Sequence, residues 1–270
     1  MTQHFPIPLR TLSVLLCDTL LAACGQSRSS APAAPTSAWQ DAPLLAQDNE
    51  WGAFDHHQAT DAQGHTMAVW EQFDGERFNI WANRKAPGQG WGVAQMIETD
   101  NAGSAYNPRV AIDSQGNAVA VWQQFDGQHS RIAANRFMVG TGWSTAQWID
   151  APNSLDAHAP QVSFDSQGNA VAVWQHKEGQ RTRIAANLLL NGAGWGQAAP
   201  IENGNGYASA PHFASDAQGH LLALWQLQGA KDTTIHTKRY LAGAGWGSDQ
   251  LLITARDDAS YRPTVLSAVY

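Results

Sequence analysis

The sequence has little charge, almost no cysteine and no long apolar run. Only 14% of its 270 residues are charged, and its formal net charge is −7. Lys and Arg form no cluster of the kind that binds phosphates, which argues against nucleic acid as a partner. The two cysteines, Cys17 and Cys24, both lie near the N-terminus. The rest of the chain therefore has no disulfide and no thiolate metal site.

The apolar run at residues 9–23 is too short to span a bilayer and has the positive charge of Arg10 at its start, which is typical of a signal peptide. It ends in L-A-A-C-G, which resembles the lipoprotein box of bacterial lipoproteins. The resemblance implies removal of residues 1–23 and lipidation of Cys24. The alternative is a non-lipidated secretory signal with a chance cysteine. Residues 24–38, with many Ser, Ala and Pro, then predict a tether that holds the protein at the bacterial cell envelope, on the outer membrane or cell surface.

A repeat of about 52 residues organises the rest of the chain, residues 39–270. The sequence D-S-Q-G-N-A-V-A-V-W-Q at Asp113–Gln123 recurs unchanged at Asp165–Gln175, with looser copies at Asp61–Glu71 and Asp216–Gln226. A fixed period in this range indicates a repeat architecture. The Trp residues that all copies share, such as Trp122, are expected to pack between repeats.

Each repeat predicts four short strands. In the second repeat we expect them at residues 108–113, 118–122, 131–137 and 143–149, followed by a link at residues 150–159. Pro108 should open the first strand, where a missing N–H is tolerated. Residues 118–122 are apolar throughout, so both faces of that strand should be covered. The sequence therefore predicts an all-β propeller of four-stranded antiparallel blades.

The repeat also predicts a half repeat at each end. Trp39–Ala46 matches a fourth strand and Pro263–Val269 matches a first strand, on either side of four full repeats. Unpaired strands of this kind are adhesive, so they could join two chains in a homo-oligomer. The chain could equally be part of a larger ring.

Two groups of aromatic residues are candidates for ligand binding, because aromatic faces stack on sugars. One group begins the outer strand of each repeat after a Gly-rich loop. The other group breaks the repeat, so the fold does not require it. The first group is Trp91, Trp143, Trp195 and Trp246; the second is Phe78, Trp81, Tyr106 and Tyr207.

The acids Glu71, Asp74 and Glu76 cluster in the first repeat, and the other repeats have Gln at the position of Glu71. A pair of carboxylates could hydrolyse glycosidic bonds. The alternative is a solvated turn. The nearby histidines His56 and His57 lack the spacing of a metal site, and no cofactor fingerprint is present, so neither metal nor cofactor is expected.

The pattern P-x-V-x-x-D-x-x-G-x-x-x-A-V-W, followed by I-x-A-N-R and G-x-G-W, resembles repeats of bacterial secreted and surface lipoproteins. It is also similar to the blades of seven-bladed propeller lectins that bind fucose-type sugars. The resemblance implies a membrane-anchored domain that binds a glycan or a surface protein without catalysis. The alternatives are a glycan hydrolase that uses the first-repeat acids, and a structural or adhesin scaffold.

Overall fold

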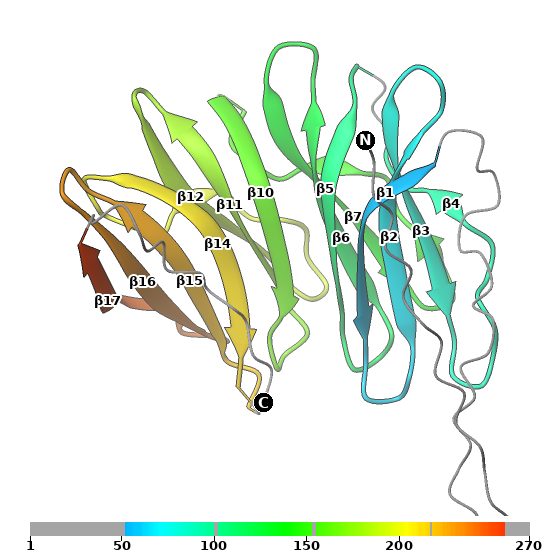
Figure 1. Cartoon of the computed structure of the whole chain (residues 1–270). Helices are drawn as coiled ribbons and strands as arrows, with labels where there is room; N and C mark the ends of the chain where they lie inside the picture. The colour runs from blue at the N-terminus through cyan, green and yellow to red at the C-terminus, as the bar shows by residue number, and fades with distance from the viewer. Residues whose placement is uncertain (1–51, 100–101, 153–154, 217, 257–270) are drawn as a thin grey trace, which may run out of the picture. The chain divides into compact units, whose positions relative to one another are not determined.

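Four antiparallel sheets follow one another along the chain (Figure 1). The computed structural model describes residues 52–99, 102–152, 155–216 and 218–256. The predicted signal peptide, Cys24, the tether and the two half repeats lie outside the described residues. Within those residues no helix has the length and apolarity of a membrane span.

Each sheet corresponds to one repeat and is built in chain order. The first contains β1 (Ala53–Thr60), β2 (Thr66–Phe73), β3 (Phe78–Lys85) and β4 (Gln95–Met96). The second contains β5 (Ala105–Ile112), β6 (Ala118–Phe125), β7 (Ser130–Met138), β8 (Gly142–Trp143) and β9 (Gln147–Trp148). The third contains β10 (Leu155–Phe164), β11 (Ala170–Glu178), β12 (Arg181–Leu189) and β13 (Ala199–Pro200). The fourth contains β14 (Tyr207–Ser215), β15 (Leu221–Gln228), β16 (Asp232–Leu241) and β17 (Gly245–Arg256).

The prediction of propeller blades is confirmed, and so is the doubly covered second strand. Ala118, Ala120 and Trp122 belong to a core cluster shared with the first sheet. Val119 and Val121, which point the other way, belong to a cluster shared with the third sheet. One strand thus contributes to two cores, and this explains why its sequence does not alternate.

Two details of the predicted repeat are wrong. The fourth strand expected at residues 143–149 consists of two short pieces, β8 and β9, which both pair with β7. Such short pieces leave little exposed edge for unwanted pairing. The link expected at residues 150–159 is also shorter, because β10 already begins at Leu155.

Pro108 does not open its strand as predicted but lies inside β5. The register of β5 against β6 shifts between Tyr106 and Arg109, so Pro108 occupies a β-bulge. A bulged residue is left out of the ladder, and the missing N–H of proline is therefore tolerated.

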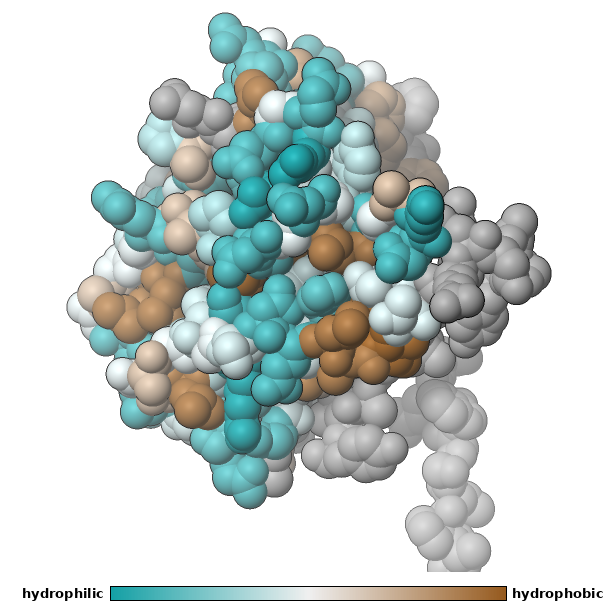
Figure 2. All heavy atoms as spheres, turned by 90° about the vertical axis from the view of Figure 1, so that its left-hand side faces the viewer, coloured by the Kyte–Doolittle hydropathy of each residue, from teal (hydrophilic) through white to brown (hydrophobic). Residues whose placement is uncertain are grey.

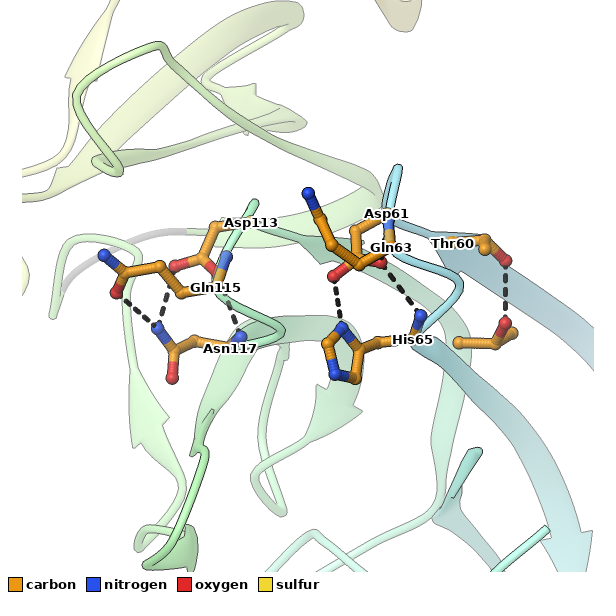
Figure 3. Close-up of polar contacts among 8 residues, drawn as sticks. Thr60, Asp61, Gln63, His65, Asp113, Gln115 and Asn117 are labelled. Carbon is orange, nitrogen blue, oxygen red and sulfur yellow. Dashed lines mark hydrogen bonds and ion pairs between the residues drawn. The ribbon is translucent and has the colours of Figure 1, made fainter. Parts of the chain in front are cut away.

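The repeated Asp turns are held by their own side chains and stack on one another between sheets. Asp113 Oδ1 accepts hydrogen bonds from the backbone N–H groups of Gln115 and Asn117, both at 2.9 Å, and Asp113 Oδ2 accepts one from Asn117 Nδ2 at 2.9 Å. Figure 3 shows this turn beside the equivalent turn of the first sheet, in which Asp61 binds His65. The Cα of Gly116 faces His65 so closely that an added Cβ would lie 3.2 Å from its ring.

Replacing Asp113 by Ala is expected to destabilise the protein by about 1–2 kcal/mol, because the half-buried N–H of Asn117 and the exposed N–H of Gln115 lose their acceptor. The corresponding fall of the melting temperature is roughly 2–8 °C. Asp113→Asn keeps a side-chain acceptor at Oδ1 and should lose less. Equal melting temperatures for wild type and Asp113→Ala would show that the turn does not need these bonds.

Candidate functional site

The first strands of the sheets, β1, β5, β10 and β14, contact one another in chain order, and each is interrupted by a bulge. At each bulge a repeat-equivalent residue has a left-handed backbone. The four φ angles are 33° at Asp55, 53° at Asn107, 50° at Ala159 and 51° at Ala210. Non-glycine residues rarely adopt this conformation, and both bulges and such strain are concentrated at functional sites.

Glu71 on β2 is the buried carboxylic acid of this region. Its side chain is buried, and its Oε1 accepts the backbone N–H of the strained Asn107 at 2.6 Å. Burial raises the pKa of Glu71, and the charge of Asp55 raises it further, against the lowering effects of Asn107 and Arg109. The equivalent positions in the other repeats hold the neutral amides Gln123, Gln175 and Gln226. The first repeat therefore has a carboxylic acid at a position where the other repeats fold with a neutral amide.

Asp55 and Arg109 place two more charged groups beside Glu71. Arg109 Nη1 lies 3.6 Å from Asp55 Oδ1, and the two side chains are 25% and 39% exposed. The same Nη1 donates a 2.7 Å hydrogen bond to the backbone oxygen of Pro108. Both groups act on the pKa of Glu71, so the buried acid lies within electrostatic range of one accessible carboxylate and one accessible guanidinium.

Two histidines stand at the positions equivalent to Arg109. His57 Nδ1 accepts the backbone N–H of Val110 at 3.3 Å, which leaves Nε2 as the protonated nitrogen of the neutral ring. Burial lowers the pKa of His57, and Arg109 lowers it further, while Asp55 opposes them. Burial and then Arg109 also lower the pKa of His212 on β14. Both imidazoles are therefore neutral near pH 7.

An aromatic cluster adjoins these charged groups. The ring of Phe78 lies 5.9 Å from Phe54, 5.1 Å from Phe73 and 5.4 Å from Tyr106, measured between centroids. Phe54 precedes Asp55 in the chain and is 52% exposed, and Tyr106 precedes Asn107. Two of the aromatic residues predicted from the sequence, Phe78 and Tyr106, are thus brought together next to Glu71. We call Phe54, Asp55, Glu71, Phe78, Tyr106 and Arg109 the first-sheet site.

The other acids predicted for catalysis lie elsewhere. Asp74 Oδ1 accepts the backbone N–H groups of Glu76 and Arg77, at 2.8 and 2.9 Å, and these bonds lower the pKa of Asp74. Asp74 and Glu76 therefore belong to the turn between β2 and β3, and the solvated-turn alternative is correct for these two. Of the three predicted acids, the structure places Glu71 alone in the first-sheet site.

The other predicted aromatic residues are dispersed. Trp81 is paired with Trp70 in the first sheet, and Tyr207 is 54% exposed at the start of β14. The outer-strand Trp residues lie away from the first-sheet site. Trp91 and Trp195 form single bridges to β3 and β12, and Trp143, Trp195 and Trp246 pack against the cores between sheets.

Three grooves accompany these outer Trp residues. Trp143 lines one of about 270 Å³ with Asn83 and Phe137. Trp246 lines two larger ones, of about 730 Å³ between the third and fourth sheets and about 980 Å³ on the fourth sheet. None of the three has two carboxylates among its described lining residues. By size, these grooves are the better candidates for binding a ligand. The first-sheet site is the better candidate for cleaving a bond, because it brings two carboxylates together.

Among the described residues no three His, Cys, Asp or Glu are grouped to hold a metal.

Sequence reasoning missed Asp55 and Arg109, and it considered His57 only as a metal ligand. The signal that could have found them is the comparison of polar residues, rather than aromatic ones, at equivalent positions of the repeats. In the second, third and fourth repeats the position of Asp55 holds Asn107, Ala159 and Ala210. The position of His57 holds Arg109, Gln161 and His212. Such variation within a regular first strand marks positions that the fold does not prescribe.

The sequence matches no family model and no curated protein. The fold does resemble solved structures. A protein of unknown function from Dyadobacter fermentans is 10% identical, with a TM-score of 0.55 over 76% of this chain and 70% of that one. An ulvan lyase of a new polysaccharide lyase family is 9% identical, with a TM-score of 0.57 over 76% and 57%. The α-L-arabinanase of Penicillium chrysogenum is 12% identical, with a TM-score of 0.52 over 78% and 69%.

These neighbours confirm the propeller-like fold and correct the functional expectation. The chain covers little more than half of the ulvan lyase, and identities this low establish shared architecture alone. The two neighbours with a named activity are nevertheless glycan-cleaving enzymes. The predicted non-enzymatic binding domain is therefore wrong, and the alternative, a glycan hydrolase, is the better supported of the two.

Proposed function

We propose that this protein cleaves a glycan at the first-sheet site, with Glu71 as the general acid. The observation that carries the proposal is the convergence of buried Glu71 with Asp55 and Arg109 at strained bulges of neighbouring first strands. The neutral amides of the other repeats show that the blade does not need an acid at this position. The lyase and arabinanase neighbours provide support from architecture.

Glu71 is suited to donate a proton because its pKa is raised by burial. A glycosidic oxygen leaves more easily when an acid that is still protonated near the working pH transfers its proton. The Asn107 N–H occupies Oε1, which leaves Oε2 to carry this proton. Asp55, the more accessible carboxylate, then serves as the second carboxylate that hydrolysis requires, either as nucleophile or as the base that activates water. The Glu71 proton moves to the leaving oxygen as the glycosidic bond breaks.

A second mechanism is favoured by the neutral histidines. If the sugar carries a carboxylate, Arg109 can bind it, and neutral His212, whose pKa Arg109 also lowers, can remove the adjacent C–H proton as general base. The electron pair of that C–H bond then forms a carbon–carbon double bond and expels the glycosidic oxygen, which Glu71 protonates. Glu71 acts as the acid in both mechanisms, so its role does not depend on which one operates.

The experiment that tests the proposed function is incubation of the purified protein with a panel of neutral and acidic polysaccharides. Release of reducing ends shows cleavage, and ultraviolet absorption by a new double bond shows elimination instead of hydrolysis. Cleavage without that absorption supports the hydrolase. If no polysaccharide in the panel yields reducing ends at high enzyme concentration, the proposed function is contradicted.

The aromatic cluster is expected to hold a sugar ring beside the acid. Replacing Phe78 by Ala should raise KM about tenfold, which corresponds to a loss of about 1.4 kcal/mol of stacking and apolar contact. Leu190→Ala removes an exposed apolar side chain next to β12, away from the first-sheet site, and serves as the control. Steady-state kinetics on the cleaved polysaccharide measures both variants. An unchanged KM for Phe78→Ala would exclude the cluster as the sugar-binding platform.

A further inference from the structure

The fourth sheet exposes positions that the other three sheets bury. Ile97, Ile149 and Ile201 occupy one repeat position and are 2%, 2% and 4% exposed, because the following sheet covers them. Leu252 occupies the same position of the sequence repeat, at a bulge of β17 between Leu251 and Ile253, and is 50% exposed. An apolar position that is otherwise always buried is therefore left open at the end of the described chain.

The outer edge of the fourth sheet is also different. The outer strands β4, β9 and β13 have two residues each, whereas β17 has twelve. Leu251 and Ile253 on β17 are 56% and 53% exposed. Figure 2 shows the side of the molecule on which β17 lies, with apolar side chains in patches between hydrophilic ones. A long apolar edge strand pairs readily with another chain unless it is covered.

A groove on the same sheet repeats a contact that is satisfied between the first two sheets. Asp216 Oδ2 lies 2.8 Å from His220 Nδ1 and 3.0 Å from Arg239 Nη2, at the edge of the groove that Leu222 and Trp246 line. In the first sheet the equivalent residues His65 and Arg84 are covered by Gly116 of the next sheet. The groove of the fourth sheet thus has the surface chemistry of a sheet-to-sheet contact and carries charges of both signs.

We propose that a second copy of this chain covers the fourth sheet, through the same surface on both copies. We call Asp216, Leu222, Arg239, Trp246 and Leu252 the terminal surface. Among the described residues, the corresponding face of each of the first three sheets packs on the next sheet of the same repeat, so a further sheet of this kind is the best-fitting partner. The Asp216–Arg239 pair of one copy can lie against the same pair of the other in reversed order, so that opposite charges meet, and this self-complementarity is what a two-fold contact requires.

A head-to-tail contact with the first sheet of the second copy fits less well. Met67 and Val69 on β2 face the second sheet, so Trp70 points to the opposite face of the strand. Trp70 is only 3% exposed, and that face is therefore already covered around Trp70. The terminal surface consequently meets its own counterpart.

The test is the mass of the full chain in solution, measured by light scattering over a range of concentrations. We expect a species of twice the mass of one chain. Leu252→Asp should raise the concentration needed for association at least about tenfold, because central apolar residues dominate such contacts. Val93→Asp changes an apolar residue that is 68% exposed in the loop between β3 and β4, and this variant should associate like wild type.

Hydrogen exchange of the wild-type protein provides a second measurement that does not depend on a variant. Backbone amides of β17 should exchange more slowly at high than at low protein concentration, while those of β4 should not change. A monomer at all concentrations, association that survives Leu252→Asp, or exchange of β17 that does not depend on concentration would each overturn the proposal.

Discussion

Replacing Glu71 by Gln is expected to lower the rate of glycan cleavage by about 10²–10⁴-fold, the range of a lost general acid. The substitution keeps the shape of the side chain and the acceptor for the Asn107 N–H. The other three repeats carry Gln at this position, so the blade is known to accommodate it. A loss of activity can therefore be assigned to the missing proton rather than to misfolding.

The same variant is expected to be more stable than wild type near pH 7. Folding raises the pKa of Glu71 above its ordinary value of 4.5, so the folded protein favours the protonated form. The contribution of Glu71 to stability is fully present below the unfolded pKa and is lost as the pH rises through the folded pKa. The advantage of Glu71→Gln should grow across that window and then level off, as measured by denaturant unfolding between pH 4 and pH 8.

Undiminished activity of the Glu71→Gln protein would contradict the assignment of Glu71 as the general acid. If Glu71→Gln keeps full activity, the acid is structural and the proton comes from elsewhere. Gln123→Ala removes an amide at the equivalent position of the second sheet and is the control for effects of the repeat position itself. Only the Glu71 variant should lose activity while keeping or gaining stability, a combination expected for residues that serve function at a cost to folding.

Replacing Trp122 by Ala is expected to destabilise the protein by about 3–5 kcal/mol. Trp122 is fully buried in the core between the first and second sheets, and its Nε1 donates a 2.8 Å hydrogen bond to Gln124 Oε1. The substitution removes the largest side chain of that core and leaves Gln124 without this donor. Because native domains are stable by only about 5–15 kcal/mol, this is a large part of the total.

The first-sheet site should be affected together with the fold, since Glu71 and Asn107 come from the two sheets that Trp122 holds together. Urea unfolding measures the change, with the midpoint falling and the slope unchanged. Trp122→Phe, which keeps most of the apolar volume, should lose clearly less than Trp122→Ala. A loss below about 1 kcal/mol for Trp122→Ala would show that the sheets do not depend on this Trp for their packing.

The fold could be predicted because the repeat determines it locally. The turn at Asp113, the apolar run that ends at Trp122 and the period between repeats each have one structural explanation, and the explanations agree. The prediction failed where two local structures meet the same requirement. Pro108 was expected at a strand start because proline lacks an N–H, but the bulge also removes the need for one, and the sequence alone does not distinguish the two solutions.

The site was predicted only in part. Glu71, Phe78 and Tyr106 could be identified because they break the repeat, and the structure brings them together. Asp55 and Arg109 lie 54 positions apart in the sequence, and their proximity depends on how neighbouring first strands contact each other. That arrangement, and the burial that raises the pKa of Glu71, are tertiary properties that no single strand encodes.

The most direct test of the account is a crystal structure of the Glu71→Gln protein with a bound oligosaccharide from a polysaccharide that wild type cleaves. We predict a sugar ring against Phe54, Phe78 and Tyr106, with a glycosidic oxygen within hydrogen-bond distance of the residue 71 side chain. An oligosaccharide bound instead only in the grooves at Trp143 or Trp246, with the first-sheet site empty, would contradict it.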